Sequence, residues 1–124
     1  MPYVSVVIPT LNEGGNIERV LSSVKRVLSS YSYEIIVVDG HSRDKTASLA
    51  RGMGARVMYD SVGKGSALLK GLAMARGKIL ISMDADLSNE PRELKLLIAG
   101  IETGYDICMG SRFIIGGGSD DMPL

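Results

Sequence analysis

The sequence has 124 residues, of which 45% are hydrophobic and 23% are charged, a composition typical of one globular domain rather than a disordered chain. Lysine plus arginine and aspartate plus glutamate number 14 each, so the formal net charge is zero, which argues against a general nucleic-acid-binding protein. The single cysteine, Cys108, permits no internal disulfide and favours a reducing, cytoplasmic compartment, while no apolar run approaches the ~20 residues of a membrane-spanning helix.

The chain begins with the pattern strand, helix, strand. Residues 3–9 are apolar and β-branched, which predicts a short buried strand that ends at Pro9, because proline cannot donate a backbone hydrogen bond. Apolar side chains at steps of three and four then predict an amphipathic helix over 15–30. A second apolar run predicts a buried strand over 33–40.

A second unit of helix and strand follows. Residues 43–54 favour a short helix, with Ser42 placed to cap its first turn and Gly52 or Gly54 placed to end it. Serine accepts hydrogen bonds from the unpaired N–H groups of a first turn, and glycine tolerates the conformation that often follows a last turn. The next run predicts a third strand over 55–60.

The third helix is predicted over 64–77, where leucines recur with helical spacing. Leu68, Leu69 and Leu72 are expected to point inward. Gly77 is expected to close the helix, because glycine commonly follows the last helical residue.

The last elements are a strand, a helix and a strand. The run at 78–84 predicts a fourth strand, and Pro91 marks the start of a helix that runs to Gly104. A fifth strand is predicted over 105–113. The remaining segment, 114–124, is rich in glycine and has no periodicity.

Strands that are apolar throughout and alternate with helices predict one α/β domain over 1–124, built on a mostly parallel sheet. Such sheets bind ligands at the carboxyl ends of their strands. The sequence places polar residues there: Asn12 and Glu13 after the first strand, Asp39 after the second, and Asp84 and Asp86 after the fourth. Oxygen ligands without a His–Ser or Cys–His pairing suit a divalent metal and a phosphorylated ligand rather than nucleophilic catalysis.

Asp84 and Asp86 are separated by one residue, so in an extended segment both carboxylates point the same way. Two like charges at that distance require a cation, and Mg²⁺ or Mn²⁺ prefers oxygen ligands. The structural alternative is a solvated turn in which Asp86 caps the next helix. HAD-type phosphatases offer a rival interpretation, but their similar motif lies on the first strand of the core and not on the fourth.

Five segments, taken in order, resemble glycosyltransferase family 2: VVIPTLNE, VVDGHSRDKT, GKGSALLKGLAMARG, MDADLS and GSRF. They cover nearly the whole chain at family-like spacing, and the subgroup they resemble is that of the polyprenyl (dolichyl) phosphate sugar synthases. The resemblance implies a GT-A fold, which is a three-layer α/β/α sandwich with a mostly parallel, Rossmann-like sheet. It agrees with the fold class predicted from the residues themselves.

The resemblance also assigns a wall of the nucleotide site. Pro9, Leu11 and Glu13 match family residues that line the nucleotide. Leu11 stands where a tyrosine is frequent, so base stacking there would be weaker or different. Val38 and Asp39 match the second strand end, where the aspartate hydrogen-bonds the base, and both uracil and guanine stay open as that base.

The metal and the phosphates are assigned to later residues. Asp84 and Asp86 match the DxD motif of the family, which with the intervening Ala85 binds the nucleotide-sugar and holds Mg²⁺ or Mn²⁺ as cofactor. Ser88 stands where many relatives carry glutamine as a further metal ligand, so the resemblance also assigns its hydroxyl to the metal, directly or through water. Arg112 matches an arginine that holds phosphate near the acceptor, a contact that suits a planar guanidinium. Asp86 and Arg112 are therefore the predicted catalytic residues.

Two other polar residues carry less information. Lys64 begins GKGSA, which lacks the spacing of a Walker phosphate loop, so it is assigned only a contact with the donor. His41 lies beside Asp39 in a loop, where a lone histidine is usually solvated rather than catalytic. Neither residue changes the assignment of the metal site.

The resemblance implies a metal-dependent, inverting transfer of a sugar from a nucleotide diphosphate-sugar, of the GDP-mannose or UDP-glucose type, to an acceptor. The acceptor that the resemblance implies is polyprenyl (dolichyl) phosphate. The lack of a convincing general base in the sequence supports it, because an ionised phosphate oxygen needs none. The sequence does not choose the base, the sugar or the acceptor by itself.

Relatives continue well past the position of Leu124, so the chain is expected to hold the donor half of a longer domain. The acceptor half and any membrane anchor would then lie beyond it, and the full-length protein would be peripheral at the cytoplasmic face of the membrane. The alternative is a nucleotide-sugar-binding domain that is inactive as it stands. Self-association through apolar surface is a further hypothesis.

Overall fold

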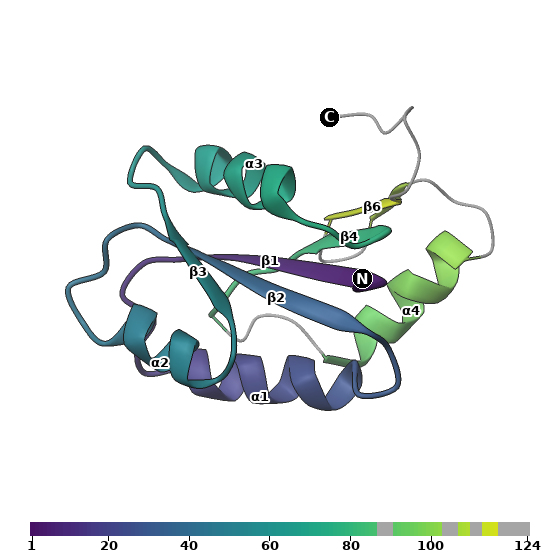
Figure 1. Cartoon of the computed structure of the whole chain (residues 1–124), viewed down its shortest axis with the longest axis horizontal. Helices are drawn as coiled ribbons and strands as arrows, with labels where there is room; N and C mark the ends of the chain where they lie inside the picture. Colours follow the sequence, from purple (N-terminus) through teal and green to yellow (C-terminus); the bar gives the residue numbers. More distant parts are fainter. Residues whose placement is uncertain (87–90, 103–106, 110–112, 117–124) are drawn as a thin grey trace.

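In a computed structural model, the chain forms a six-stranded sheet with helices on both faces (Figure 1). The structure describes residues 1–86, 91–102, 107–109 and 113–116. The strands are β1 (Val4–Thr10), β2 (Tyr33–Asp39), β3 (Arg56–Tyr59), β4 (Ile79–Ser82), β5 (Ile107–Met109) and β6 (Phe113–Gly116). The helices are α1 (Ile17–Val27), α2 (Thr46–Gly52), α3 (Lys64–Met74) and α4 (Pro91–Glu102). No helix in these described segments has the length and apolarity to cross a bilayer.

The strands lie in the order β3-β2-β1-β4-β6-β5, and the first four in this order are parallel. Strand β6 runs antiparallel to β4, and β5 runs antiparallel to β6. The predicted α/β fold on a mostly parallel sheet is therefore confirmed. The prediction of one strand over 105–113 is wrong, because two short strands pair with each other instead, and β6 extends into the segment that showed no periodicity. The apolar content of a segment does not by itself distinguish one continuous strand from two short strands.

Three layers result, with α3 on one face of the sheet and α1, α2 and α4 on the other (Figure 1). One core packs β1 side chains such as Val6 and Ile8 against Ile17 and Leu21 of α1. The other core lies under α3 and includes Val7. Alternate side chains of a strand point to opposite faces, so the continuous apolar runs of β1 and β2 supply both cores.

Pro9 does not end β1 as predicted, since the strand continues to Thr10 in register with β2. The Gly40 N–H donates to the Thr10 carbonyl, so the backbone groups of even-numbered β1 residues hydrogen-bond to β2. The backbone nitrogen of Pro9 is therefore on the side of β4. The pairing with β4 already ends at Val7 and Ser82. The missing N–H of the proline therefore costs no hydrogen bond of the sheet.

The start of α2 also differs from the prediction. Ser42 does not cap the helix, which begins at Thr46, because the Ser42 hydroxyl donates to Asp39 instead. The end of the helix agrees with the prediction, since Gly54 has a positive φ of 92° just after the last turn. Its N–H donates to the Arg51 carbonyl, which closes the helix in the left-handed manner that glycine favours.

The three leucines predicted to point inward from α3 differ in burial. Leu72 is buried and Leu68 is half-buried, but Leu69 is 59% exposed, so that part of the prediction is wrong. Only the side of α3 that packs on β1 and β2 is covered. Gly71 sets the closeness of this packing, because a Cβ at this position would lie 2.3 Å from a methyl carbon of Val7.

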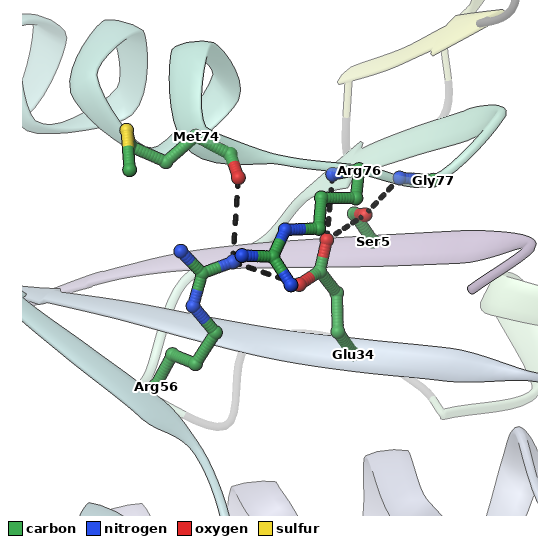
Figure 2. Close-up of polar contacts among 6 residues, drawn as sticks. All are labelled: Ser5, Glu34, Arg56, Met74, Arg76 and Gly77. Carbon is green, nitrogen blue, oxygen red and sulfur yellow. Dashed lines mark hydrogen bonds and ion pairs between the residues drawn. The ribbon is translucent and has the colours of Figure 1, made fainter. Parts of the chain in front are cut away.

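Helix α3 ends at Met74 and not at Gly77, which was predicted to close it. The Met74 carbonyl accepts a hydrogen bond from the Arg56 guanidinium at 3.3 Å, and a cation suits this negative end of the helix (Figure 2). Gly77 lies between α3 and β4 and donates its N–H to the Ser5 hydroxyl at 2.8 Å. The chain is thereby tied to β1 before it enters β4.

Glu34 is the centre of this polar cluster at the amino ends of the strands (Figure 2). One carboxylate oxygen pairs with the Arg56 guanidinium at 3.0 Å. The other oxygen accepts hydrogen bonds from the Ser5 hydroxyl at 2.6 Å and the Arg76 N–H at 2.7 Å. Burial alone would raise the pKa of Glu34, but these hydrogen bonds and the guanidinium together hold it below its ordinary value of 4.5.

Candidate functional site

The carboxyl ends of the four parallel strands, with the amino end of α3, surround a pocket of about 340 Å³. This is the edge at which open α/β sheets bind ligands. The predicted residues that line the pocket are Pro9, Leu11, Glu13, Val38, Lys64, Asp84, Ala85 and Asp86. The other lining residues are Thr10, Gly40, Asp60, Ser61, Gly63 and Ala67.

The loop after β1 forms one wall of the pocket and is fixed by the loop after β2. Asn12, which has a φ of 53°, donates its N–H to the Ser42 hydroxyl at 2.7 Å. Its side-chain oxygen accepts the Arg43 N–H at 2.8 Å. Asparagine tolerates this left-handed conformation better than most residues. Leu11, which precedes it, lines the pocket and stays 60% exposed, so an apolar side chain is offered to a ligand.

A second set of hydrogen bonds holds the start of the loop that leads into α1. The Glu13 N–H donates to Oγ1 of Thr46 at 2.9 Å, and the Gly14 N–H donates to a carboxylate oxygen of Asp44 at 3.0 Å. Hydrogen bonds from the Thr46 hydroxyl and N–H hold the pKa of Asp44 below its ordinary value, so this acceptor stays ionised. The Glu13 side chain therefore reaches the pocket from a fixed backbone.

Asp39 is the predicted base-binding residue, and it is only 1% exposed and does not belong to the pocket lining. Its Oδ1 accepts hydrogen bonds from the hydroxyls of Thr10 and Ser42, both at 2.7 Å. Its Oδ2 accepts the Ser42 N–H at 2.7 Å. The carboxylate therefore joins the loops after β1 and β2, and its contact with a base stays a prediction.

Asp60 follows β3 and lines the pocket, although it was not predicted. A signal was available, because Asp60 ends the third apolar run as Asp39 ends the second. Its carboxylate accepts hydrogen bonds from the Ser66 hydroxyl at 2.7 Å and the Val62 N–H at 2.8 Å. The Ser66 hydrogen bond, supported by that of Val62, holds the pKa of Asp60 below its ordinary value, so this wall carries an ionised acid.

The predicted metal-binding residues Asp84 and Asp86 line the pocket just after β4, with buried Ala85 between them. Lys64, the first residue of α3, places its Nζ 2.8 Å from Oδ1 of Asp84. The exposed fraction of the side chain is 68% for Lys64 and 30% for Asp84. Asp84 thus already holds a cationic group at the point where the metal was predicted.

Two carboxylates on one pocket fit a magnesium or manganese ion. Such ions often take one or two protein carboxylates and complete their shell with water and substrate phosphates. Within the described segments, no group of three or more histidine, cysteine, aspartate or glutamate side chains could hold a metal. Asp84 and Asp86 suit a metal whose shell is completed by water and substrate phosphates.

Two predicted residues, Ser88 and Arg112, lie outside the described residues. His41 is described and does not line the pocket. Its ring stacks on Tyr59 with a centroid separation of 5.2 Å, and the guanidinium carbon of Arg51 lies 5.5 Å from the centroid of the same ring. His41 is therefore part of a stack of side chains with Tyr59 and Arg51.

The sequence of this chain is similar to those of known proteins. The profile of glycosyl transferase family 2 matches residues 5–124. The dolichol-phosphate mannosyltransferase of Pyrococcus furiosus is 36% identical over an alignment 127 residues long, gaps included. The alignment covers 98% of this chain and 36% of that protein. An undecaprenyl-phosphate 4-deoxy-4-formamido-L-arabinose transferase of Proteus mirabilis is 36% identical over 121 residues, which cover 88% of this chain and 36% of that protein. The chain thus spans 36% of the length of these curated relatives.

A similar solved structure is that of glucosyl-3-phosphoglycerate synthase from Mycobacterium tuberculosis in complex with Mn²⁺ and UDP-glucose. Its TM-score is 0.73 at 34% sequence identity, and the match covers 86% of this chain and 41% of that one. The same synthase has been solved with Mg²⁺ and UDP. This similarity confirms the predicted GT-A type of α/β fold. Because the family profile matches nearly all of its residues, the chain belongs to glycosyltransferase family 2.

Proposed function

We propose that the chain is the donor-binding part of a nucleotide-sugar glycosyltransferase, in which a divalent cation assists transfer of the sugar to an acceptor. The observation that carries the proposal is the pocket at the strand ends. Every predicted donor-site residue within the described segments, apart from Asp39, lines this pocket. These residues come from β1 and the loop after it, from β2, from the start of α3 and from the segment after β4, which are distant in the sequence and converge in the fold.

The roles of the pocket residues follow from their chemistry. Asp84 and Asp86 would hold Mg²⁺ or Mn²⁺, which when bound supplies positive charge opposite the leaving diphosphate. Lys64 adds an ammonium at the same place, with donors that can rotate toward phosphate oxygens. Pro9 and Leu11 add apolar surface to the lining of the pocket, which suits the faces of a base.

The proposed acceptor is a polyprenyl (dolichyl) phosphate. Two relatives support it, since one is named for dolichol phosphate and the other for undecaprenyl phosphate. An ionised phosphate oxygen also needs no general base to attack the sugar. The proposed donor is a UDP-sugar or a GDP-sugar, and UDP-glucose is the ligand in the similar mycobacterial structure.

Titration of the purified chain with UDP and with GDP, in the presence and absence of Mn²⁺, tests the donor site by calorimetry. We expect one nucleotide to bind in a Mn²⁺-dependent manner. Asp86→Asn should weaken that binding at least about 10-fold, because a direct metal ligand should matter no less than the residues that hold the ligands in place. Unchanged Mn²⁺-dependent binding in Asp86→Asn, or no binding of either nucleotide to the wild type, would refute the donor site.

The matched control for this titration is Glu18→Gln, which removes an exposed carboxylate from the first turn of α1. Glu18 does not line the pocket, so this variant should bind nucleotide and Mn²⁺ as the wild type does. A loss of binding in both variants would indicate an effect of total charge and not of a metal ligand.

A second candidate function is nucleotide-sugar binding without transfer. One observation favours it, since the chain spans only 36% of the length of its curated relatives and acceptor residues could belong to the remaining part. Assays of donor hydrolysis and sugar transfer, on the preparation that binds nucleotide, separate the two. Turnover supports the first candidate, and Mn²⁺-dependent binding without turnover supports the second.

A further inference from the structure

We propose that Lys64 competes with the divalent cation for Asp84, and that a nucleotide diphosphate relieves this competition by drawing the ammonium onto its phosphates. Metal and nucleotide would then bind cooperatively, each raising the affinity for the other. The inference rests on the proposed function, because it assigns a regulatory role to a lysine that lines the donor pocket.

The geometry makes the competition direct. Nζ of Lys64 lies 2.8 Å from Oδ1 of Asp84, which is a charge-assisted hydrogen-bond distance. A Mg²⁺ ion would need a carboxylate oxygen at roughly 2.0–2.1 Å. On the same oxygen, the ammonium and the metal would lie within about 5 Å of each other, so the repulsion of like charges disfavours their simultaneous binding.

Lys64 can leave Asp84 at low cost. Its side chain is 68% exposed, and ion pairs with such exposed partners are weak. It is the first residue of α3, and Gly63 before it also lines the pocket, so the positive end of the helix faces the same space. A diphosphate there offers the ammonium more negative charge than one carboxylate does, and the long side chain reaches it by rotation.

A metal ion that contacts both protein carboxylates and phosphate strengthens the coupling. Asp84, Asp86 and Ser88 are the predicted protein ligands, and Asp84 and Asp86 line the pocket. Magnesium and manganese ions usually complete their shell with water and substrate phosphates, so a bound diphosphate would add ligands to the same metal. By linkage, the factor by which the nucleotide raises the metal affinity equals the factor by which the metal raises the nucleotide affinity.

Electron paramagnetic resonance of free Mn²⁺, measured with and without UDP or GDP, tests the inference without turnover. Lys64→Gln should bind Mn²⁺ alone about two- to fivefold more tightly than the wild type, as expected when an exposed ion pair is removed. The factor by which the nucleotide raises the Mn²⁺ affinity should fall by about the same two- to fivefold.

The matched control is Lys78→Gln, which removes an exposed lysine just before β4, at the end of that strand away from the pocket. It should bind Mn²⁺ and nucleotide as the wild type does. Lys64→Met, which keeps the length of the side chain without its charge, should reproduce the behaviour of Lys64→Gln.

Two results would overturn the inference. The first is a Mn²⁺ affinity without nucleotide that Lys64→Gln leaves unchanged. The second is an equal rise in Lys64→Gln and Lys78→Gln, which would be a general effect of lost positive charge. Both differ from failure of the proposed function, in which the wild type binds neither nucleotide in the presence of Mn²⁺.

Discussion

Two ion pairs lie near opposite ends of α3, and they have similar distances in different surroundings. Nη1 of Arg56 lies 3.0 Å from Oε1 of Glu34, and the side chains are 34% and 12% exposed. Nζ of Lys64 lies 2.8 Å from Oδ1 of Asp84, and these side chains are 68% and 30% exposed. The first pair is at the amino ends of the strands, next to the last turn of α3 (Figure 2), and the second is at their carboxyl ends.

The surroundings of each carboxylate determine what the pair does. The Ser5 hydroxyl and the Arg76 N–H hold the oxygen of Glu34 that Arg56 does not contact, so one side chain joins β1, β3 and the segment before β4. Asp84 lines a pocket, and the ammonium beside it belongs to a long, exposed side chain. The first pair organises the backbone, whereas the second is placed to respond to a ligand.

Glu34→Gln should cause the larger loss of stability. The amide keeps the size of the side chain but removes the charge to which Arg56, Ser5 and Arg76 donate. We expect the free energy of unfolding to fall by about 2 kcal/mol, which urea unfolding followed by circular dichroism measures. Glu18→Gln on α1 should change it by less than about 0.5 kcal/mol. Equal effects of the two changes would mean that the cluster does not organise the fold.

The contribution of Glu34 should also depend on pH. Its pKa in the folded chain is lower than its ordinary value of 4.5, so its stabilising effect is full above about pH 4.5. That effect is lost as the pH falls through the lower, folded-state pKa. The difference in unfolding free energy between the wild type and Glu34→Gln should therefore shrink from about pH 7 to about pH 3. A difference that stays constant over this range would contradict the assignment.

Lys64→Gln should have the smallest effect on stability. We expect the free energy of unfolding to change by at most about 0.5 kcal/mol, because an ion pair with an exposed lysine contributes little. Urea unfolding should be measured on the same preparation as Mn²⁺ binding, so that stability and metal affinity are compared for one sample. A loss as large as that of Glu34→Gln would remove the distinction between the two ends of α3.

Much of the pocket could be predicted because the ends of the strands are marked locally. Asp84 and Asp86 follow one apolar run, and Glu13 follows another, so the tendency of parallel sheets to bind ligands at one edge placed them together. Leu11 was assigned through the resemblance to the family and not through its position alone. The same reasoning applied to the third run would have included Asp60.

The contacts between neighbouring strands could not be predicted in this way. Asp39 and Asp84 look alike in the sequence, since each follows an apolar run. In the structure Asp39 is buried and accepts hydrogen bonds from Thr10 and Ser42, while Asp84 lines the pocket. Thr10 belongs to β1, and no local pattern states which strand lies beside β2.

The sequence by itself determined the order of strands and helices as far as α4, and the edge of the sheet that carries the acids, because both depend on local periodicity. Only the tertiary structure decided that Leu69 is exposed, that 105–113 does not form one strand, and that Lys64 pairs with Asp84. The type of a side chain, apolar or charged, indicates from the sequence alone that it needs a partner. Which partner it finds depends on elements that lie far apart in the chain and meet only when the sheet has formed.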